Sequence, residues 1–196
     1  MLRLAAGKNE GVYCLQAVIA AESALLKLAG SAMEACIVPL GQHLWLLPMT
    51  DALFDAVTVD GAPELDGFWK APAGFERLLT ACSEAGPVAF VEADYFGGTG
   101  TQIAQVWDAG EVVLGPLRLA EGEPSPTTGT PISQALRRLG AVKGTHVDEF
   151  SAVDLGRHRD TEDWLSLIDT AVRSCQGCLA EVGEPCSSNC LPGPYA

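Results

Sequence analysis

The sequence is poor in positive charge and in histidine. Its 196 residues include 12 lysines and arginines and only three histidines, against 25 aspartates and glutamates, for a formal net charge of −13. Proteins bind the phosphates of nucleic acids and anionic lipids through clustered Lys and Arg. We therefore expect neither a nucleic-acid partner nor a membrane partner. The acidity favours either simple solubility or a basic protein partner.

Long apolar segments are also missing. Lys8, Glu10, Glu22 and Lys27 interrupt the first 30 residues, which argues against a secretory signal sequence. No segment approaches the roughly 20 apolar residues that span a bilayer. We expect a cytoplasmic protein, in which seven cysteines do not indicate a disulfide framework.

In the remaining sequence, the spacing of apolar residues and the glycines and prolines between segments predict an α+β fold. We expect a central, mainly antiparallel sheet with flanking helices in a single domain, residues 1–172, followed by a Cys-rich tail, residues 173–196. Ala109-Gly110 is expected to join the last two strands by a tight turn, and Thr50 and Thr161 are expected to cap helices. Strands are predicted at residues 11–20, 35–40, 44–48, 88–95, 102–107 and 112–117, and helices at 21–29, 51–58, 73–84, 131–139, 148–153 and 161–172.

A glycine-rich stretch follows the fourth strand and contains Gly97, Gly98 and Thr99. A phosphate-binding loop would need a Gly-Lys-Ser/Thr ending and a helix behind it, and the sequence continues instead as a strand. We interpret the stretch as a β-hairpin or bulge that needs positive φ. The alternative is a loop that contacts a ligand or a partner.

Two carboxylates, Glu92 and Asp94, lie two residues apart on the preceding strand and therefore share a face. Such a pair could act as acid and base or bind a cation. The simpler interpretation places both on the solvent side of the sheet, because apolar residues alternate with them.

The densest basic cluster is Arg157, His158 and Arg159, flanked by Asp154 and Asp160. The two arginines could bind an anion, and the histidine could transfer a proton. The cluster could instead form part of an interface, or form ion pairs with its acidic neighbours. An enzyme acting on a small molecule or anion is an alternative function, and it would require Glu92, Asp94, Arg157 and His158 to converge in one pocket. No catalytic motif supports this, since no serine lies in a Gly-x-Ser-x-Gly context.

The cysteines fall into two groups. Cys14, Cys36 and Cys82 lie in apolar segments and are expected to be buried thiols. The tail contains Cys175, Cys178, Cys186 and Cys190. Thiolates favour tetrahedral zinc, and the first pair has the usual spacing of a zinc knuckle. Zinc binding, disulfides formed on oxidation, and free thiols all remain open, and a metal-binding protein is a further alternative function. No other cofactor is expected.

The segment of residues 91–107, together with Leu155-Gly-Arg-His-Arg-Asp-Thr-Glu-Asp-Trp164, resembles a group of bacterial immunity proteins encoded beside secreted antibacterial toxins. The resemblance spans residues 90–164 with gaps, and the cysteine tail departs from it. It transfers no catalytic residue. What it implies is a cytoplasmic protein that neutralises a cognate toxin by direct binding, with a basic toxin domain as partner.

An interface would use exposed aromatic and basic side chains, the usual anchors of protein–protein contacts. We expect Phe68 and Trp69 in the loop at residues 60–69 to contribute. The turn at residues 97–101, the nearby Glu92 and Asp94, and the segment from Arg157 to Asp163 are the other expected parts.

Overall fold

In the computed structural model, residues 11–166 are described. The expected boundary after residue 172 and the four cysteines Cys175, Cys178, Cys186 and Cys190 lie outside the described residues. So does most of the helix expected at residues 161–172.

The described chain is built on one six-stranded antiparallel sheet, which confirms the expected α+β fold. The order across the sheet is β2-β3-β1-β4-β5-β6, so β1 and β4 lie at its centre. The strands β4, β5 and β6 form the expected meander. The bounds are β1 Val12–Ala21, β2 Val38–Pro39, β3 Leu44–Pro48, β4 Val88–Phe96, β5 Thr99–Asp108 and β6 Glu111–Leu119.

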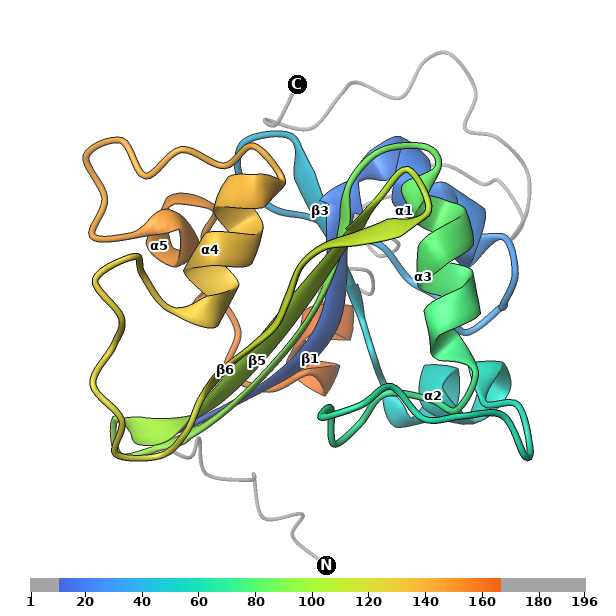
Figure 1. Ribbon diagram of the computed structural model, residues 1–196, viewed down its shortest axis with the longest axis horizontal. Helices are drawn as coiled ribbons and strands as arrows, with labels where there is room; N and C mark the ends of the chain where they lie inside the picture. Colours follow the sequence, from blue (N-terminus) through green and yellow to red (C-terminus); the bar gives the residue numbers. More distant parts are fainter. Residues whose placement is uncertain (1–10, 167–196) are drawn as a thin grey trace, which may run out of the picture. The chain divides into compact units, whose positions relative to one another are not determined.

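Helices lie on both faces of this sheet (Figure 1). One face, here called the α3 face, carries α1 (Glu22–Ala29), α2 (Asp51–Val57) and α3 (Phe75–Ser83). The opposite α4 face carries α4 (Pro131–Arg138) and α5 (Glu149–Ala152). A short 3-10 helix, η1, spans Glu162–Leu165. Within residues 11–166, no helix has the length and apolar character needed to cross a bilayer.

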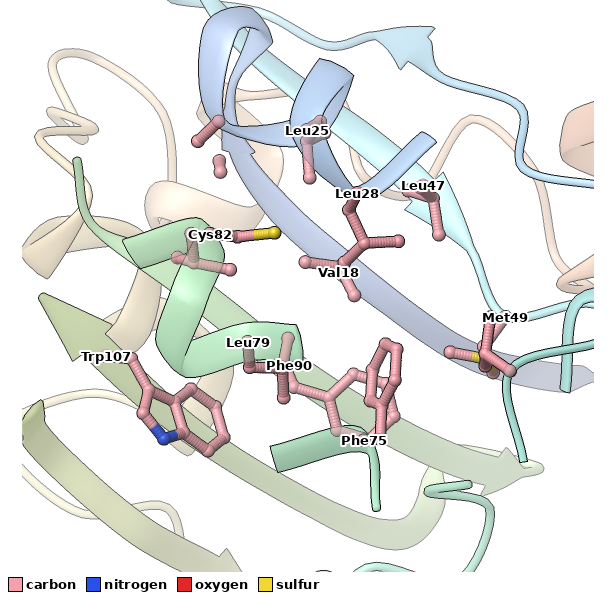
Figure 2. Packing of buried hydrophobic residues seen from close by; sticks show 14 of the residues in the cluster. Val18, Leu25, Leu28, Leu47, Met49, Phe75, Leu79, Cys82, Phe90 and Trp107 are labelled. Carbon is pink, nitrogen blue, oxygen red and sulfur yellow. The ribbon is translucent and has the colours of Figure 1, made fainter. Parts of the chain in front are cut away.

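The main core fills the space between the α3 face and its helices (Figure 2). Phe90 on β4 contacts Phe75 of α3 edge to face, with ring centroids 5.5 Å apart. The central strands are buried on both sides, so alternate residues supply each face. The labelled core residues are Val18, Leu25, Leu28, Leu47, Met49, Phe75, Leu79, Cys82, Phe90 and Trp107.

The glycine-rich stretch forms the predicted hairpin. Phe96 of β4 pairs with Thr99 of β5, which leaves a two-residue turn at Gly97 and Gly98. Both have positive φ, 60° and 87°, as the turn type that suits strand twist requires. Gly100 needs its missing side chain for another reason, because a Cβ there would collide with the backbone of β4.

The chain after α5 returns to the sheet beside the first half of β1, where β3 does not reach. The Cys14 amide donates to the Arg159 carbonyl oxygen (2.8 Å), and Cys14 and Asp160 form a parallel bridge. Thr161 is not a helix cap as expected. Its hydroxyl accepts from the Gln16 amide (3.0 Å) and lies 3.1 Å from the Gln16 side-chain oxygen.

Candidate functional site

Glu92 is fully buried, so the prediction that it faces solvent is wrong. It does share a face with Asp94, which is exposed. The Glu92 carboxylate accepts two backbone hydrogen bonds, from the amides of Trp69 and Lys70, each at 2.8 Å. The loop between α2 and α3 thus covers the strand at this point, and the carboxylate replaces the hydrogen bonds that the loop backbone would make to water.

Burial raises the pKa of Glu92 to about 7, although the two amides and the Lys70 charge act in the opposite direction. Removal from water therefore outweighs the local donors. Both carboxylate oxygens are held by the loop, so the residue serves as an attachment point for Trp69 and Lys70.

The residues beside Glu92 on β1 are polar and joined to one another. Gln16 is its cross-strand neighbour and is itself buried. The Gln16 side-chain amide donates to the Cys14 sulfur (3.1 Å). Cys14 is half-buried, and burial raises the pKa of its thiol, with smaller contributions from Asp94 and Asp160 in the same direction. A thiol held in its neutral form is a poor nucleophile.

Of the three cysteines within residues 11–166, only Cys82 is buried as expected. Cys14 and Cys36 are both partly exposed. An apolar sequence around a cysteine therefore did not guarantee its full burial.

Around this polar centre, exposed carboxylates gather from segments far apart in the sequence. Asp51 at the start of α2 forms an ion pair with Lys70 (2.7 Å), which lowers the pKa of the Asp51 carboxyl. The Asp51 amide also donates to the Glu162 carboxylate (3.0 Å). Asp160 lies beside Cys14 on one side, and Asp94 pairs with Cys14 on the other.

Two exposed aromatic side chains belong to the same region. Trp69 is 49% exposed and follows Phe68 in the covering loop, and Phe96 is 75% exposed at the end of β4. Because a strand advances about 3.3 Å per residue, Phe96 lies roughly 13 Å beyond Glu92 along that strand. We call the set of Asp51, Trp69, Asp94, Phe96, Asp160 and Glu162 the acidic–aromatic surface.

Phe68 is not part of this surface, contrary to expectation. Its ring turns inward and packs against Phe90, with centroids 5.0 Å apart. Trp69 follows it in a bend of the loop and stays about half exposed. One aromatic of the pair thus anchors the loop to the core, and the other is left at the surface.

The basic cluster is divided between two environments. The Arg157 guanidinium donates to the Pro39 carbonyl oxygen (2.7 Å) and lies 5.0 Å from the centre of the Trp164 ring. His158 packs against the same indole at 4.9 Å, and burial lowers the pKa of its imidazole. Arg159 points elsewhere and lines a cavity on the α4 face.

The two acidic and the two basic residues of the enzyme hypothesis have different partners. Glu92 holds the loop, whereas Arg157 and His158 pack on Trp164. Within residues 11–166 no hydrogen bond or ion pair joins Glu92 or Asp94 to Arg157 or His158. The same part of the chain holds no group of three or more His, Cys, Asp or Glu side chains arranged to bind a metal ion.

Several residues of this region escaped the sequence interpretation. The sequence analysis predicted no functional role for Phe96 or Asp51. Lys70 carried no signal at all. Alternation along β4 places Phe96 on the same face as Asp94 and could have indicated it, but the contacts of Asp51 with Lys70 and Glu162 have no local signature.

Comparison of the chain with protein-family models, with curated proteins and with solved structures finds no match. The resemblance to immunity proteins therefore remains a prediction, and the geometry of the site is the basis for any functional proposal.

Proposed function

We propose that this chain is a cytoplasmic inhibitor protein of the immunity type, which neutralises a basic toxin domain by binding it through the acidic–aromatic surface. The observation that carries the proposal is the combination of exposed carboxylates with two exposed aromatics, Trp69 in the loop over Glu92 and Phe96 at the end of the same strand. A surface of this composition suits a partner that presents Lys and Arg around an apolar pocket.

Charge and aromatic contacts would have separate roles in such a complex. Opposite charges accelerate association and exclude unsuitable partners, and their contribution falls as salt rises. Aromatic side chains supply most of the binding energy when they are buried at the centre of an interface. Lys70 and Asp51 form an ion pair and together add no net charge, so the acidity of the surface comes from Asp94, Asp160 and Glu162.

The backbone that carries the two aromatic side chains is held in place by other parts of the fold. Glu92 fixes the backbone of Trp69, and the hairpin turn fixes the end of β4 next to Phe96. Side chains held in place before binding lose less conformational entropy when the complex forms. This supports a role in recognition for the two aromatics.

The experiment is a rescue assay with the secreted toxin encoded beside the gene. Cells that express the toxin domain would be complemented with the wild-type chain, with a Trp69→Ala, Phe96→Ala double variant, and with a Leu26→Ala, Met33→Ala control. The control removes exposed apolar side chains beyond the opposite end of β1. We expect the wild type and the control to protect and the double variant to fail at equal protein levels.

The proposal would be wrong if the wild type protected no cell from that toxin, or if no toxin gene lay beside this one. Equal protection by the double variant would remove the acidic–aromatic surface as the binding site and leave the inhibitory function in place.

A further inference from the structure

A solvent-open cavity of about 350 Å³ lies on the α4 face of the sheet, on the opposite side from the acidic–aromatic surface. Tyr13 and Tyr95, a cross-strand pair on β1 and β4, form its floor. The volume is in the range of pockets that hold small organic molecules. Its other lining residues are Gln102, Thr130, Asp148, Phe150, Gly156 and Arg159.

Three aromatic rings give the cavity flat, apolar walls. Tyr13 and Phe150 meet edge to face with centroids 5.6 Å apart, and the Tyr13 hydroxyl donates to the Leu155 carbonyl oxygen (3.1 Å). The floor is therefore fixed to the segment that carries Arg159. Rings arranged in this way favour a planar, aromatic guest.

Some polar side chains that line the cavity already form hydrogen bonds within the protein, and one does not. Gln102 accepts from the Ile132 amide at the start of α4 (3.2 Å). Asp148 accepts from the amide and hydroxyl of Ser151 as the cap of α5. Arg159 supplies the lining cation, and its guanidinium forms no hydrogen bond or ion pair with any residue among 11–166. A planar guanidinium with free donors matches a carboxylate.

We propose that this cavity binds a small aromatic carboxylate, with its ring among Tyr13, Tyr95 and Phe150 and its carboxylate on Arg159. A single negative charge fits better than a phosphate, because Asp148 also lines the cavity and would repel a dianion. The site does not depend on the proposed inhibitory function, since none of its residues belongs to the acidic–aromatic surface.

The test measures binding of three probes of the same shape by titration calorimetry and by ¹⁵N-edited NMR. The probes are 2-naphthoate, the neutral 2-naphthamide and the cationic 2-naphthylmethylamine. We expect 2-naphthoate to bind with a Kd below about 1 mM and to shift the amide signals of residues that line the cavity. The amide and the amine should bind at least tenfold more weakly.

Two variants locate the charge and the ring contacts. Arg159→Gln should weaken 2-naphthoate about tenfold to 100-fold, the range for a lost charged hydrogen bond, and leave the amide unchanged. Arg138→Gln makes the same change on the exposed side of α4 and should have no effect. Phe150→Leu, checked for folding by circular dichroism, should weaken all three probes.

Other results would overturn the proposal. Absence of 2-naphthoate binding at millimolar concentration would do so, as would equal binding of 2-naphthoate and 2-naphthamide. Equal effects of Arg159→Gln and Arg138→Gln would also reject the assignment. Stronger binding of phenyl phosphate than of benzoate would reject the carboxylate class.

Discussion

Replacing Glu92 by glutamine isolates the cost of burying a carboxylate beneath the loop that carries Trp69. Glutamine keeps the size of the side chain and one acceptor oxygen for the loop amides, but it cannot ionise. The buried acid has its pKa raised to about 7, whereas an unfolded chain gives glutamate its ordinary value near 4.3. Between these values the folded state binds more protons than the unfolded state.

Stability from this group therefore falls as pH rises. Integrating the linkage relation over the two pKa values gives a loss of about 2.5 kcal/mol between pH 5 and pH 8. The Glu92→Gln variant lacks this term. Its free energy of unfolding should therefore increase relative to that of wild type by about this amount from pH 5 to pH 8, because only wild type loses stability.

The assay is urea denaturation followed by circular dichroism at pH 5, 6, 7 and 8. Asp94→Asn is the matched control, since it removes the same charge from an exposed position two residues away. The net charge of −13 affects wild type and both variants, so the difference between variants isolates Glu92. A wild type that gains stability relative to Glu92→Gln as pH rises would show that the two amides outweigh burial, and would refute the reasoning.

Three further predictions concern the surface, the hairpin and the histidine. Trp69→Ala and Phe96→Ala should each change the free energy of unfolding by less than about 1 kcal/mol in thermal or urea denaturation, because about half of Trp69 and most of Phe96 is already exposed. Each should nevertheless weaken the toxin complex at least about 10-fold in calorimetry. Gly100→Ala should destabilise the chain by more than Gly97→Asn destabilises it, because the Cβ at position 100 meets the backbone of β4, whereas the space beside Gly97 is open and Asn tolerates its positive φ; equal losses in urea denaturation would contradict this. His158 should titrate in NMR below its ordinary pKa, because burial disfavours its charged form, and its contribution to stability should decrease as pH falls below about 6.5; titration above that value would reject the stacked, buried position.

Local sequence patterns were sufficient to predict most of the fold. The meander from β4 to β6 follows from alternation and from the turn at Gly97 and Gly98, which depend on residues adjacent in sequence. The cap of α2 was also predicted, because the Thr50 hydroxyl accepts from the amide three residues on.

Errors arose where distant segments meet. Glu92 is buried by a loop more than 20 residues earlier, and Thr161 bonds to Gln16 across 145 positions. Alternation assigns a residue to a face of the sheet but does not show what covers that face. For the same reason Phe68 and Trp69 could not be separated into a core residue and a surface residue before the loop was placed.

The most direct test of the central claim is the affinity of the purified chain for the domain of the adjacent toxin, measured by calorimetry at 50 and 300 mM NaCl. Wild type would be compared with a variant carrying Asp51→Asn, Asp94→Asn, Asp160→Asn and Glu162→Gln, which keeps one acceptor oxygen on each side chain and removes four charges. Binding through the acidic–aromatic surface predicts a tight complex that weakens with salt, and a variant that binds more weakly with little dependence on salt. Identical affinity and identical salt dependence in the two proteins would contradict the claim.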